Sequence, residues 1–267
     1  MASRTKHFIS AIALVGALAL GACSGNKAAD KAYVEEPVEK LYNAAVDELE
    51  RSNYDAASVK FDEVERQHPY STWAVKAQVM AAYSLYMANK YDEAVVSLDR
   101  FIQLHPSNAD TPYAYYLKGL CYYEQISDVG RDQMMTQLAL KTLNELITRF
   151  PESEYSRDAK VKIELTYDHL AGKEMKIGRY YQSRAQWLAA INRFDTVINK
   201  YETTTHVAEA LHRLVESYLA LGLRAEAKKA AAVLGHNFPS SKWYVESYAI
   251  LEDPSIKAPT EPWYKVW

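Results

Sequence analysis

A segment that recurs five times constrains the fold of this chain more than any other feature. The stretches NYDAASVKFDEVERQHP and KYDEAVVSLDRFIQLHP align without gaps at a spacing of 37 residues, ending at Pro69 and Pro106. Three further segments end in a similar way at Pro151, Glu202 and Pro239. Repeats of this length are typical of solenoids, in which each unit buries its apolar face against its neighbours.

Apolar positions recur inside each segment, and their spacing predicts a helix. An alanine lies twelve residues before each terminus, at Ala57, Ala94, Ala139, Ala190 and Ala227. Four residues after it come Phe61, Leu98, Leu143, Phe194 and Ala231, and three further on come Val64, Phe101, Leu146, Val197 and Leu234. Steps of four and three place these positions on one helical face. The proline then ends the helix, and Glu202 predicts a different ending in the fourth repeat.

A partner helix is expected before each of these helices. The reference position of this partner helix, which is usually a small residue, falls at Ala45, Ala82, Gly119, Glu164 and Val215. From there to the alanine the step is 12 residues in repeats one, two and five, but 20 in repeat three and 26 in repeat four. The excess predicts longer turns between the two helices of these repeats, near Glu124–Thr136 and Ala171–Gln186.

This pattern resembles the tetratricopeptide repeat (TPR), in which a small residue, an alanine, two core residues and a terminal proline recur. The sequence therefore predicts an all-α chain, a right-handed α-solenoid of five TPR helix pairs with longer intra-repeat turns in repeats three and four. The repeats span about 37–71, 72–108, 109–154, 155–204 and 205–244. Scarce glycine and proline also favour helices. The alternative is a plain helical bundle with chance periodicity.

The N-terminus has the features of a secretory signal peptide over residues 1–22. Arg4 and Lys6 precede an apolar run, which ends in the small residues before Cys23. The run is shorter than the roughly 20 residues that span a membrane. A cysteine after the cut is typical of bacterial lipoproteins, so we expect a diacylglycerol and an N-acyl chain on Cys23 and no other cofactor. An ordinary exported protein with an incidental cysteine is the alternative.

The residues after Cys23 indicate where the protein would be held. Serine at position 24, rather than aspartate, favours the outer membrane, so we expect lipid anchoring there on the periplasmic face. Residues 23–36 are polar and predict an acylated N-terminus with a flexible tether. Removing the leader changes the formal net charge from -3 to -5, because Arg4 and Lys6 are lost. Such a chain has no electrostatic footprint for nucleic acid.

Candidate catalytic and metal-binding residues are few. His206 and His212 lack the spacing that puts two metal ligands on one helix face. No HExxH, GxSxG or glycine-rich phosphate loop occurs. Cys121 lies among apolar residues and predicts a buried small side chain. We therefore expect no metal site and no enzyme activity.

A set of tyrosines is the main candidate binding surface. The usual concave positions of the first helices include Tyr42, Tyr83, Tyr86, Tyr113, Tyr116 and Tyr123. Tyrosine combines a large apolar ring with a hydrogen-bonding tip, which suits an extended peptide bearing aromatic side chains. The alternative is that these rings pack between repeats.

Several stretches resemble the BamD family of outer membrane assembly lipoproteins: DRFIQLHP (Asp99–Pro106), YYLKGL (Tyr115–Leu120), RFPESEY (Arg149–Tyr155) and YYQSRAQWLAAINR (Tyr180–Arg193). The resemblance implies a non-catalytic scaffold of the β-barrel assembly (BAM) machinery. Its C-terminal repeats would dock the membrane-proximal POTRA domain of a BamA-like barrel protein. Its N-terminal repeats would hold the C-terminal signals of unfolded barrel proteins. Other BAM lipoproteins are further expected partners.

One pair of residues carries over from the family. The resemblance implies that Asn192 and Arg193 bind the BamA-like partner, with the arginine meeting a carboxylate, since its planar fork grips a carboxylate bidentately. A free surface arginine is the alternative.

The tail, residues 245–267, is rich in proline and tryptophan, and it would either cap the solenoid or bind a partner. The competing function is a TPR envelope lipoprotein that coordinates cell-wall synthesis with outer membrane constriction.

Overall fold

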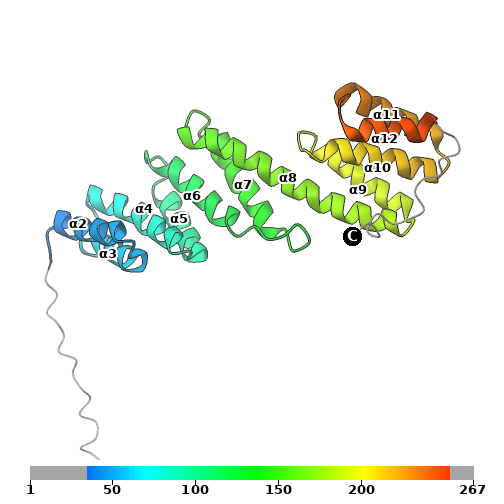
Figure 1. The fold of residues 1–267 in the computed structure, drawn as a ribbon. Coiled ribbons are helices and arrows are strands. Elements are labelled where there is room, and N and C mark those ends of the chain that lie inside the picture. The colour runs from blue at the N-terminus through cyan, green and yellow to red at the C-terminus, as the bar shows by residue number, and fades with distance from the viewer. Residues whose placement is uncertain (1–34, 253–267) are drawn as a thin grey trace, which may run out of the picture. The chain divides into compact units, whose positions relative to one another are not determined.

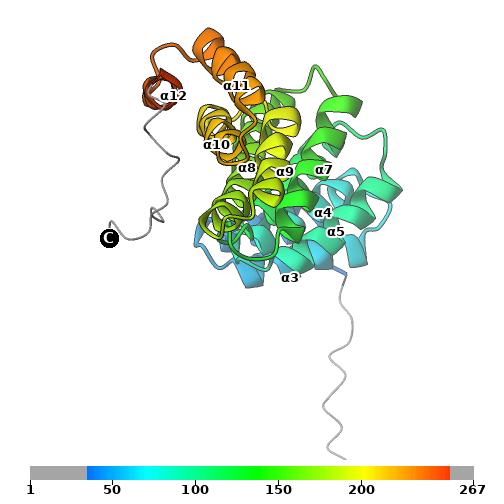
Figure 2. The same ribbon diagram turned by 90° about the vertical axis from the view of Figure 1, so that its right-hand side faces the viewer.

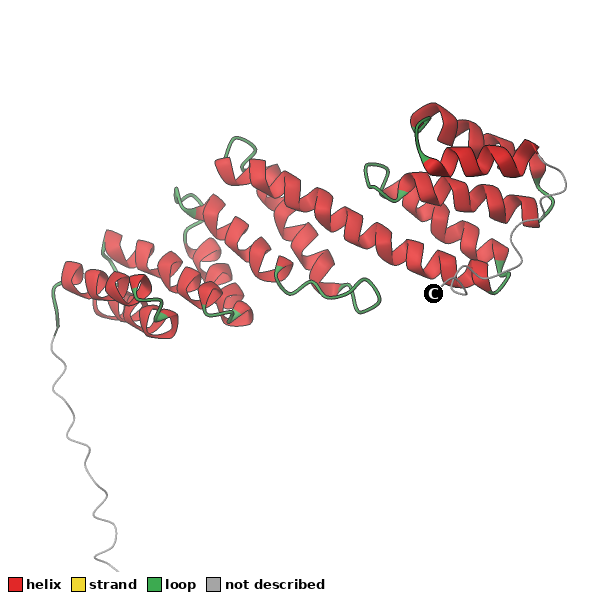
Figure 3. Ribbon diagram, viewed as in Figure 1, coloured by secondary structure: helices red, strands yellow, loops and turns green. Residues whose placement is uncertain are grey.

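The computed structural model describes residues 35–252, and every regular element in this range is a helix (Figures 1 and 3). The prediction of an all-α chain is confirmed. The eleven helices are α2 (Val38–Glu50), α3 (Tyr54–Gln67), α4 (Thr72–Met87), α5 (Tyr91–Leu104), α6 (Thr111–Tyr123), α7 (Met134–Arg149), α8 (Glu154–Ser183), α9 (Trp187–Lys200), α10 (Val207–Ala220), α11 (Arg224–Asn237) and α12 (Lys242–Glu252). The predicted signal peptide, Cys23 and most of the tether lie outside the described residues, as do residues 253–267.

The helices from α2 to α11 form five consecutive pairs, and their core is the predicted one. The five alanines of the second helices are all buried, because a neighbouring helix passes close to each of them. The ten core residues four and seven positions further on are buried too. Each helix packs against the next one along the chain, so the contacts run from pair to pair as in a TPR solenoid.

Four of the five pairs are joined by a three-residue turn with one residue in the left-handed region. These residues are Ser52, Asn89, Ala185 and Gly222, with φ between 56° and 75°. Each lies seven positions after a small residue of the preceding helix, at Ala45, Ala82, Gly178 and Val215. The backbone therefore closes these four turns in the same way.

All five second helices also end alike, although the sequence predicted a different ending for the fourth. Their capping residues are His68, His105, Phe150, Tyr201 and Phe238, and each donates its backbone N–H to the carbonyl four residues earlier. Tyr201 keeps this geometry although Glu202 replaces proline. The prediction was wrong because each capping residue leaves the helical conformation, with φ between −128° and −133°, whether or not proline follows it.

The long turn predicted in repeat four is also wrong. The extra residues lie inside α8, which runs unbroken for 30 residues, and the turn to α9 is short. No proline interrupts Ala171–Ser183, and the segment contains several good helix formers. Fourteen added residues make about 3.9 helical turns, so they lengthen α8 by roughly 21 Å and almost preserve the direction of its apolar face.

The small position of repeat four is consequently Gly178 rather than Glu164. Glu164 is exposed, whereas a Cβ built on Gly178 would lie closer than 3.0 Å to the ring of Phe194. Gly178 precedes Phe194 by sixteen residues, the same step that separates Ala45 from Phe61. The first half of α8 instead packs on α7 through Ala159 and Ile163.

The long turn predicted in repeat three is present, between α6 and α7. This loop lies along the added turns of α8, because Lys173 Nζ donates to the carbonyls of Gly130 and Arg131 at 3.1 and 3.0 Å. Lys176 approaches Asp128 at 3.5 Å in the same region. The two insertions, which are far apart in the sequence, therefore contact each other.

The predicted boundary between solenoid and tail, at 244/245, falls inside α12. Ser241 caps the start of this helix by accepting a hydrogen bond from the backbone N–H of Tyr244. Trp243, Tyr244 and Leu251 pack against the core of the last pair. Figure 2 shows α12 at the C-terminal end, and it contacts both α10 and α11. The start of the tail is thus part of the folded body.

Candidate partner-binding surfaces

Four of the predicted tyrosines lie close together on the first helices of repeats two and three. Tyr83 and Tyr86 come from α4, Tyr113 and Tyr116 from α6, and all are partly buried. Tyr155 of α8 joins them, with ring centroids 5.2 Å from Tyr113 and 5.6 Å from Tyr116. We call these five residues the aromatic row.

Three phenol groups of the aromatic row, those of Tyr86, Tyr113 and Tyr116, have raised pKa values and stay neutral. Burial, helped by the charge of Glu124, raises the pKa of Tyr86 to about 12. Burial also raises the pKa of Tyr113, and burial with a hydrogen bond to Asp158 raises that of Tyr116. The hydroxyl of Tyr116 donates to the Asp158 carboxylate. The rings thus offer apolar faces while a polar tip is held in place.

The other two predicted tyrosines have other ring partners. Tyr42 packs on Phe61 and Trp73, with centroids 5.3 and 4.8 Å away. Tyr123 lies 5.0 Å from the ammonium nitrogen of Lys162. Packing between repeats, the alternative that the sequence left open, accounts for the contacts of Tyr42 with Trp73 and of Tyr123 with Lys162, and Tyr42 meets Phe61 within its own repeat. Peptide binding by these residues stays a prediction.

Two exposed aliphatic residues lie on α8 within two turns of Asp158, and sequence reasoning missed them. Val161 and Leu165 lie one turn apart on α8 with 59% and 53% of their surface exposed. They follow Asp158, which binds Tyr116. A signal was present, since Val161 lies 45 residues after Tyr116, the same spacing that separates Pro151 from Pro106.

The predicted partner-binding pair lies on α9. Asn192 is exposed, and the side chain of Arg193 is 41% exposed. The guanidinium donates through one nitrogen to Glu174 of α8 at 3.0 Å, a contact that the sequence did not predict. Arg193 is therefore held by an internal carboxylate on one side and reaches solvent on the other.

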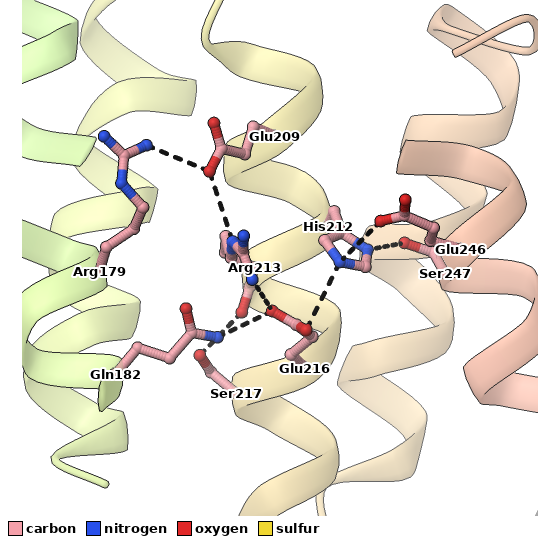
Figure 4. A network of polar contacts seen from close by, with 9 residues as sticks. All are labelled: Arg179, Gln182, Glu209, His212, Arg213, Glu216, Ser217, Glu246 and Ser247. Carbon is pink, nitrogen blue, oxygen red and sulfur yellow. Dashed lines mark hydrogen bonds and ion pairs between the residues drawn. The ribbon is translucent and has the colours of Figure 1, made fainter. Parts of the chain in front are cut away.

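A partly buried polar network joins α8, α10 and α12 (Figure 4). Arg179 of α8 pairs with Glu209 at 3.1 Å, and Gln182 donates to Glu216 at 2.9 Å. Arg213 bridges the two carboxylates of α10, at 3.4 Å from Glu209 and 2.8 Å from Glu216. Sequence reasoning missed the contacts between helices in this network because they join residues that are far apart in the sequence.

His212 extends the network to α12. The histidine is 2% exposed, and its Nδ1 lies 2.8 Å from the Ser247 hydroxyl. Its Nε2 lies 3.5 Å from Glu216 and 3.7 Å from Glu246. Burial by itself would raise the pKa of Glu216, but His212 and Arg213 outweigh it and hold that pKa at about 2. The network therefore fixes α12 on α10 with an ionised carboxylate inside.

The remaining chemistry of the described residues is sparse. Burial raises the pKa of the Cys121 thiol to about 12, which agrees with the predicted buried small side chain. Across residues 35–252, no cluster of histidine, cysteine and carboxylate side chains suits a metal ion. None of the helices in the same range combines the length and apolarity that crossing a membrane requires.

Comparison with known proteins identifies the family. Residues 34–234 match the family YfiO, described as outer membrane lipoprotein. The chain belongs to this family. YfiO relatives include the outer membrane protein assembly factor BamD of Caulobacter vibrioides, 48% identical over 95% of this chain and 84% of the relative. The BamD of Rickettsia prowazekii is 47% identical over 94% and 98%.

More distant YfiO relatives carry the same name. The BamD of Neisseria meningitidis is 33% identical over 94% of this chain and 96% of the relative. A solved TPR protein from Thermus thermophilus superposes with a TM-score of 0.39 at 18% identity, covering 81% of this chain and all of its own. The TPR assignment therefore rests on the five helix pairs of this chain and not on that superposition. These relatives are named as outer membrane protein assembly factors.

Proposed function

We propose that this chain is a non-catalytic scaffold lipoprotein of the outer membrane β-barrel assembly machinery. The observation that carries the proposal is the similarity, over nearly the whole chain, to proteins named outer membrane protein assembly factor BamD. A solenoid of helix pairs suits the role, because stacked repeats offer extended surfaces to several partners.

The proposed attachment to the membrane is through Cys23. Acyl chains contribute about 0.8 kcal/mol per buried CH₂, so the diacylglycerol and N-acyl chains together would anchor the protein stably. The family description as outer membrane lipoprotein supports this anchor and the outer membrane location. The solenoid would then face the periplasm.

The proposed docking site for a POTRA-bearing, BamA-like barrel protein is on the C-terminal repeats, at Asn192 and Arg193. The partial exposure of Arg193 supports it. Glu174 orients the guanidinium from one side, which reduces the side-chain entropy that a partner would have to overcome. The free edge of the planar group suits a carboxylate of the partner.

The proposed site for the C-terminal signals of unfolded barrel proteins is the aromatic row with Val161 and Leu165. The row offers the neutral phenols of Tyr86, Tyr113 and Tyr116, and Asp158 holds the hydroxyl of Tyr116. The two aliphatic residues are exposed on the same helix as Asp158. An extended segment bearing aromatic side chains would cover these aliphatic groups. Binding would then draw on apolar area that the free protein leaves in water.

The test is affinity purification of the acylated protein from its own envelope in mild detergent, read by mass spectrometry. Recovery of a POTRA-bearing barrel protein is expected. Arg193→Glu should lose that protein, because the new carboxylate repels both Glu174 and the partner's carboxylate.

Arg100→Glu is the matched control, since Arg100 also lies on a second helix and pairs with a carboxylate, Glu65. This variant should retain the barrel protein, and both variants should keep a helical circular-dichroism spectrum. Equal recovery with the two variants would remove Arg193 from the docking site. Recovery of cell-wall synthases instead would favour a role in outer membrane constriction.

A further inference from the structure

The last helix, α12, is the first helix of an incomplete sixth repeat. Residues 238–252 match residues 201–215 at the spacing of 37. Phe238 replaces Tyr201 as the cap of the preceding helix, and both donate their backbone N–H to the carbonyl four residues earlier. Ser247 is buried at the place of Ala210. In the described residues, no second helix follows α12.

Repeats two, three and four show where that second helix would lie. The residue four positions before the small position points to the second helix of its own repeat. Gln78 contacts His105 at 3.1 Å, Tyr115 contacts Glu145 at 3.4 Å, and Glu174 contacts Arg193 at 3.0 Å. Leu211, the equivalent in repeat five, is 3% exposed.

In α12 the corresponding residue is Tyr248, which is 55% exposed. It lies 37 residues after Leu211 and therefore faces the direction in which its own second helix would pack. The buried network at His212 and Ser247 fixes the rotation of α12 on α10, so this exposure is not a matter of a loosely placed helix. Tyr248 is thus an exposed aromatic side chain at a position whose equivalents in repeats two, three and four contact a second helix.

Tyr248 lines an open groove of about 490 Å³ between α11 and α12. Ala231 and Ala232 contribute small side chains from α11, and Tyr244 and Tyr248 contribute rings from α12. Arg224, Lys228 and Glu252 add charges of both signs, and Arg224 donates to the carbonyl of Leu251. A suitable occupant would carry aromatic side chains that pack on the two rings.

The chain itself supplies a segment of this kind. We propose that residues 253–267 occupy the groove, with Trp263, Tyr264 or Trp267 covering Tyr248. This inference goes beyond the scaffold function and does not depend on it.

Length and position favour this occupant. Leu251 and Glu252, which line the groove, are the residues from which the segment starts. The eleven residues from Glu252 to Trp263 reach at most about 40 Å, and α12 itself is about 16 Å long, so the aromatic residues can return along it. Pro254, Pro259 and Pro262 disfavour a regular second helix, so covering would come from the rings of an extended chain.

The proposed contact would also prevent end-to-end association. An uncovered first helix would accept the second helix of another solenoid, and such head-to-tail contacts tend to form open chains of molecules. Aromatic side chains bury about 150–250 Å² each, enough for one or two of them to cover a surface of this size.

Hydroxyl-radical footprinting of the acylated full chain in mild detergent tests the proposal. The chain provides an internal reference, because Tyr180 is 52% exposed, nearly the same fraction as Tyr248. In the full chain, Tyr248 should be oxidised more slowly than Tyr180. In a chain that ends at Asp253, the two rates should become equal.

The double variant Trp263→Ala/Trp267→Ala should give the same loss of protection at full length, which guards against misfolding of the shortened chain. Equal rates of Tyr248 and Tyr180 in the full chain would overturn the proposal. So would protection that persists without residues 254–267. Protection that disappears on dilution, together with a dimer in light scattering, would assign the groove to a second copy instead.

Discussion

Gly178 provides the sharpest test of the helix register in repeat four. Replacing it by alanine adds one methyl group at the point where α8 and α9 come closest. A Cβ at this position would lie within 3.0 Å of three atoms of the Phe194 ring, and that ring is fully buried. The ring cannot move outward, so the two helices must separate or the ring must leave its preferred rotamer.

A second glycine in the same helix gives the matched control. A Cβ built on Gly172 would lie 3.2 Å from Nε2 of His206 and 3.5 Å from Val129, contacts that need only a small adjustment. Inside a helix, alanine is favoured over glycine by about 1 kcal/mol, and both variants gain this amount. The difference between them therefore isolates the steric cost, which is about 1–3 kcal/mol for an overpacked core.

The measurement is urea unfolding of residues 24–267, followed by far-UV circular dichroism. Gly172→Ala should be as stable as the parent or more stable, and Gly178→Ala should be less stable than Gly172→Ala by about 1–3 kcal/mol. Hydrogen exchange should place the weakening in α8 and α9. Adding Phe194→Leu to Gly178→Ala should cost less than the sum of the two single changes, since the smaller side chain makes room.

A free energy of unfolding of Gly178→Ala that equals or exceeds that of Gly172→Ala would refute the reasoning. If Gly178→Ala were as stable as Gly172→Ala, α9 would not pack against α8 at Gly178. The assignment of Gly178 as the small position of repeat four would then be wrong, and Glu164 would have to be reconsidered.

Two further predictions concern the C-terminal network and the second repeat. The lowered pKa of Glu216 means that its contribution to stability is present above about pH 4.5 and is lost as the pH falls toward about 2. Glu216→Gln should lower the stability at pH 7 by about 3 kcal/mol and flatten this acid limb in urea unfolding, and identical pH profiles would contradict it. Ala94→Leu should cost about 1–3 kcal/mol, because Ala94 is fully buried at a close helix contact. An unchanged melting temperature would argue against the repeat register.

Much of the fold could be predicted from the sequence because the signal was local. The steps of four and three residues placed five alanines and ten further apolar residues on buried helix faces, and all fifteen are buried. The candidate site could be predicted from the sequence only in part. The positions of the tyrosines followed from the register, but their ring contacts with Tyr155, Phe61 and Trp73 depend on which helices meet.

The contacts between helices that the sequence missed join distant segments. Glu174 meets Arg193 across α8 and α9, and His212 meets Ser247 across α10 and α12. Charged and polar residues have no periodicity of their own in this chain. Their partners are set by the stacking of the repeats, so a single sequence gives no means of pairing them.

The sequence by itself determined the helical class, the five second helices and the residues of their core. Only the tertiary structure decided that the insertion of repeat four lengthens α8, that Gly178 is the closest point of its pair, and that α12 begins a sixth repeat. The physical reason is periodicity. Fourteen residues make about 3.9 helical turns, so an inserted helical segment keeps nearly the same face as before and resembles a long turn in the spacing alone. Packing against α9 and against the loop of repeat three distinguishes the two arrangements.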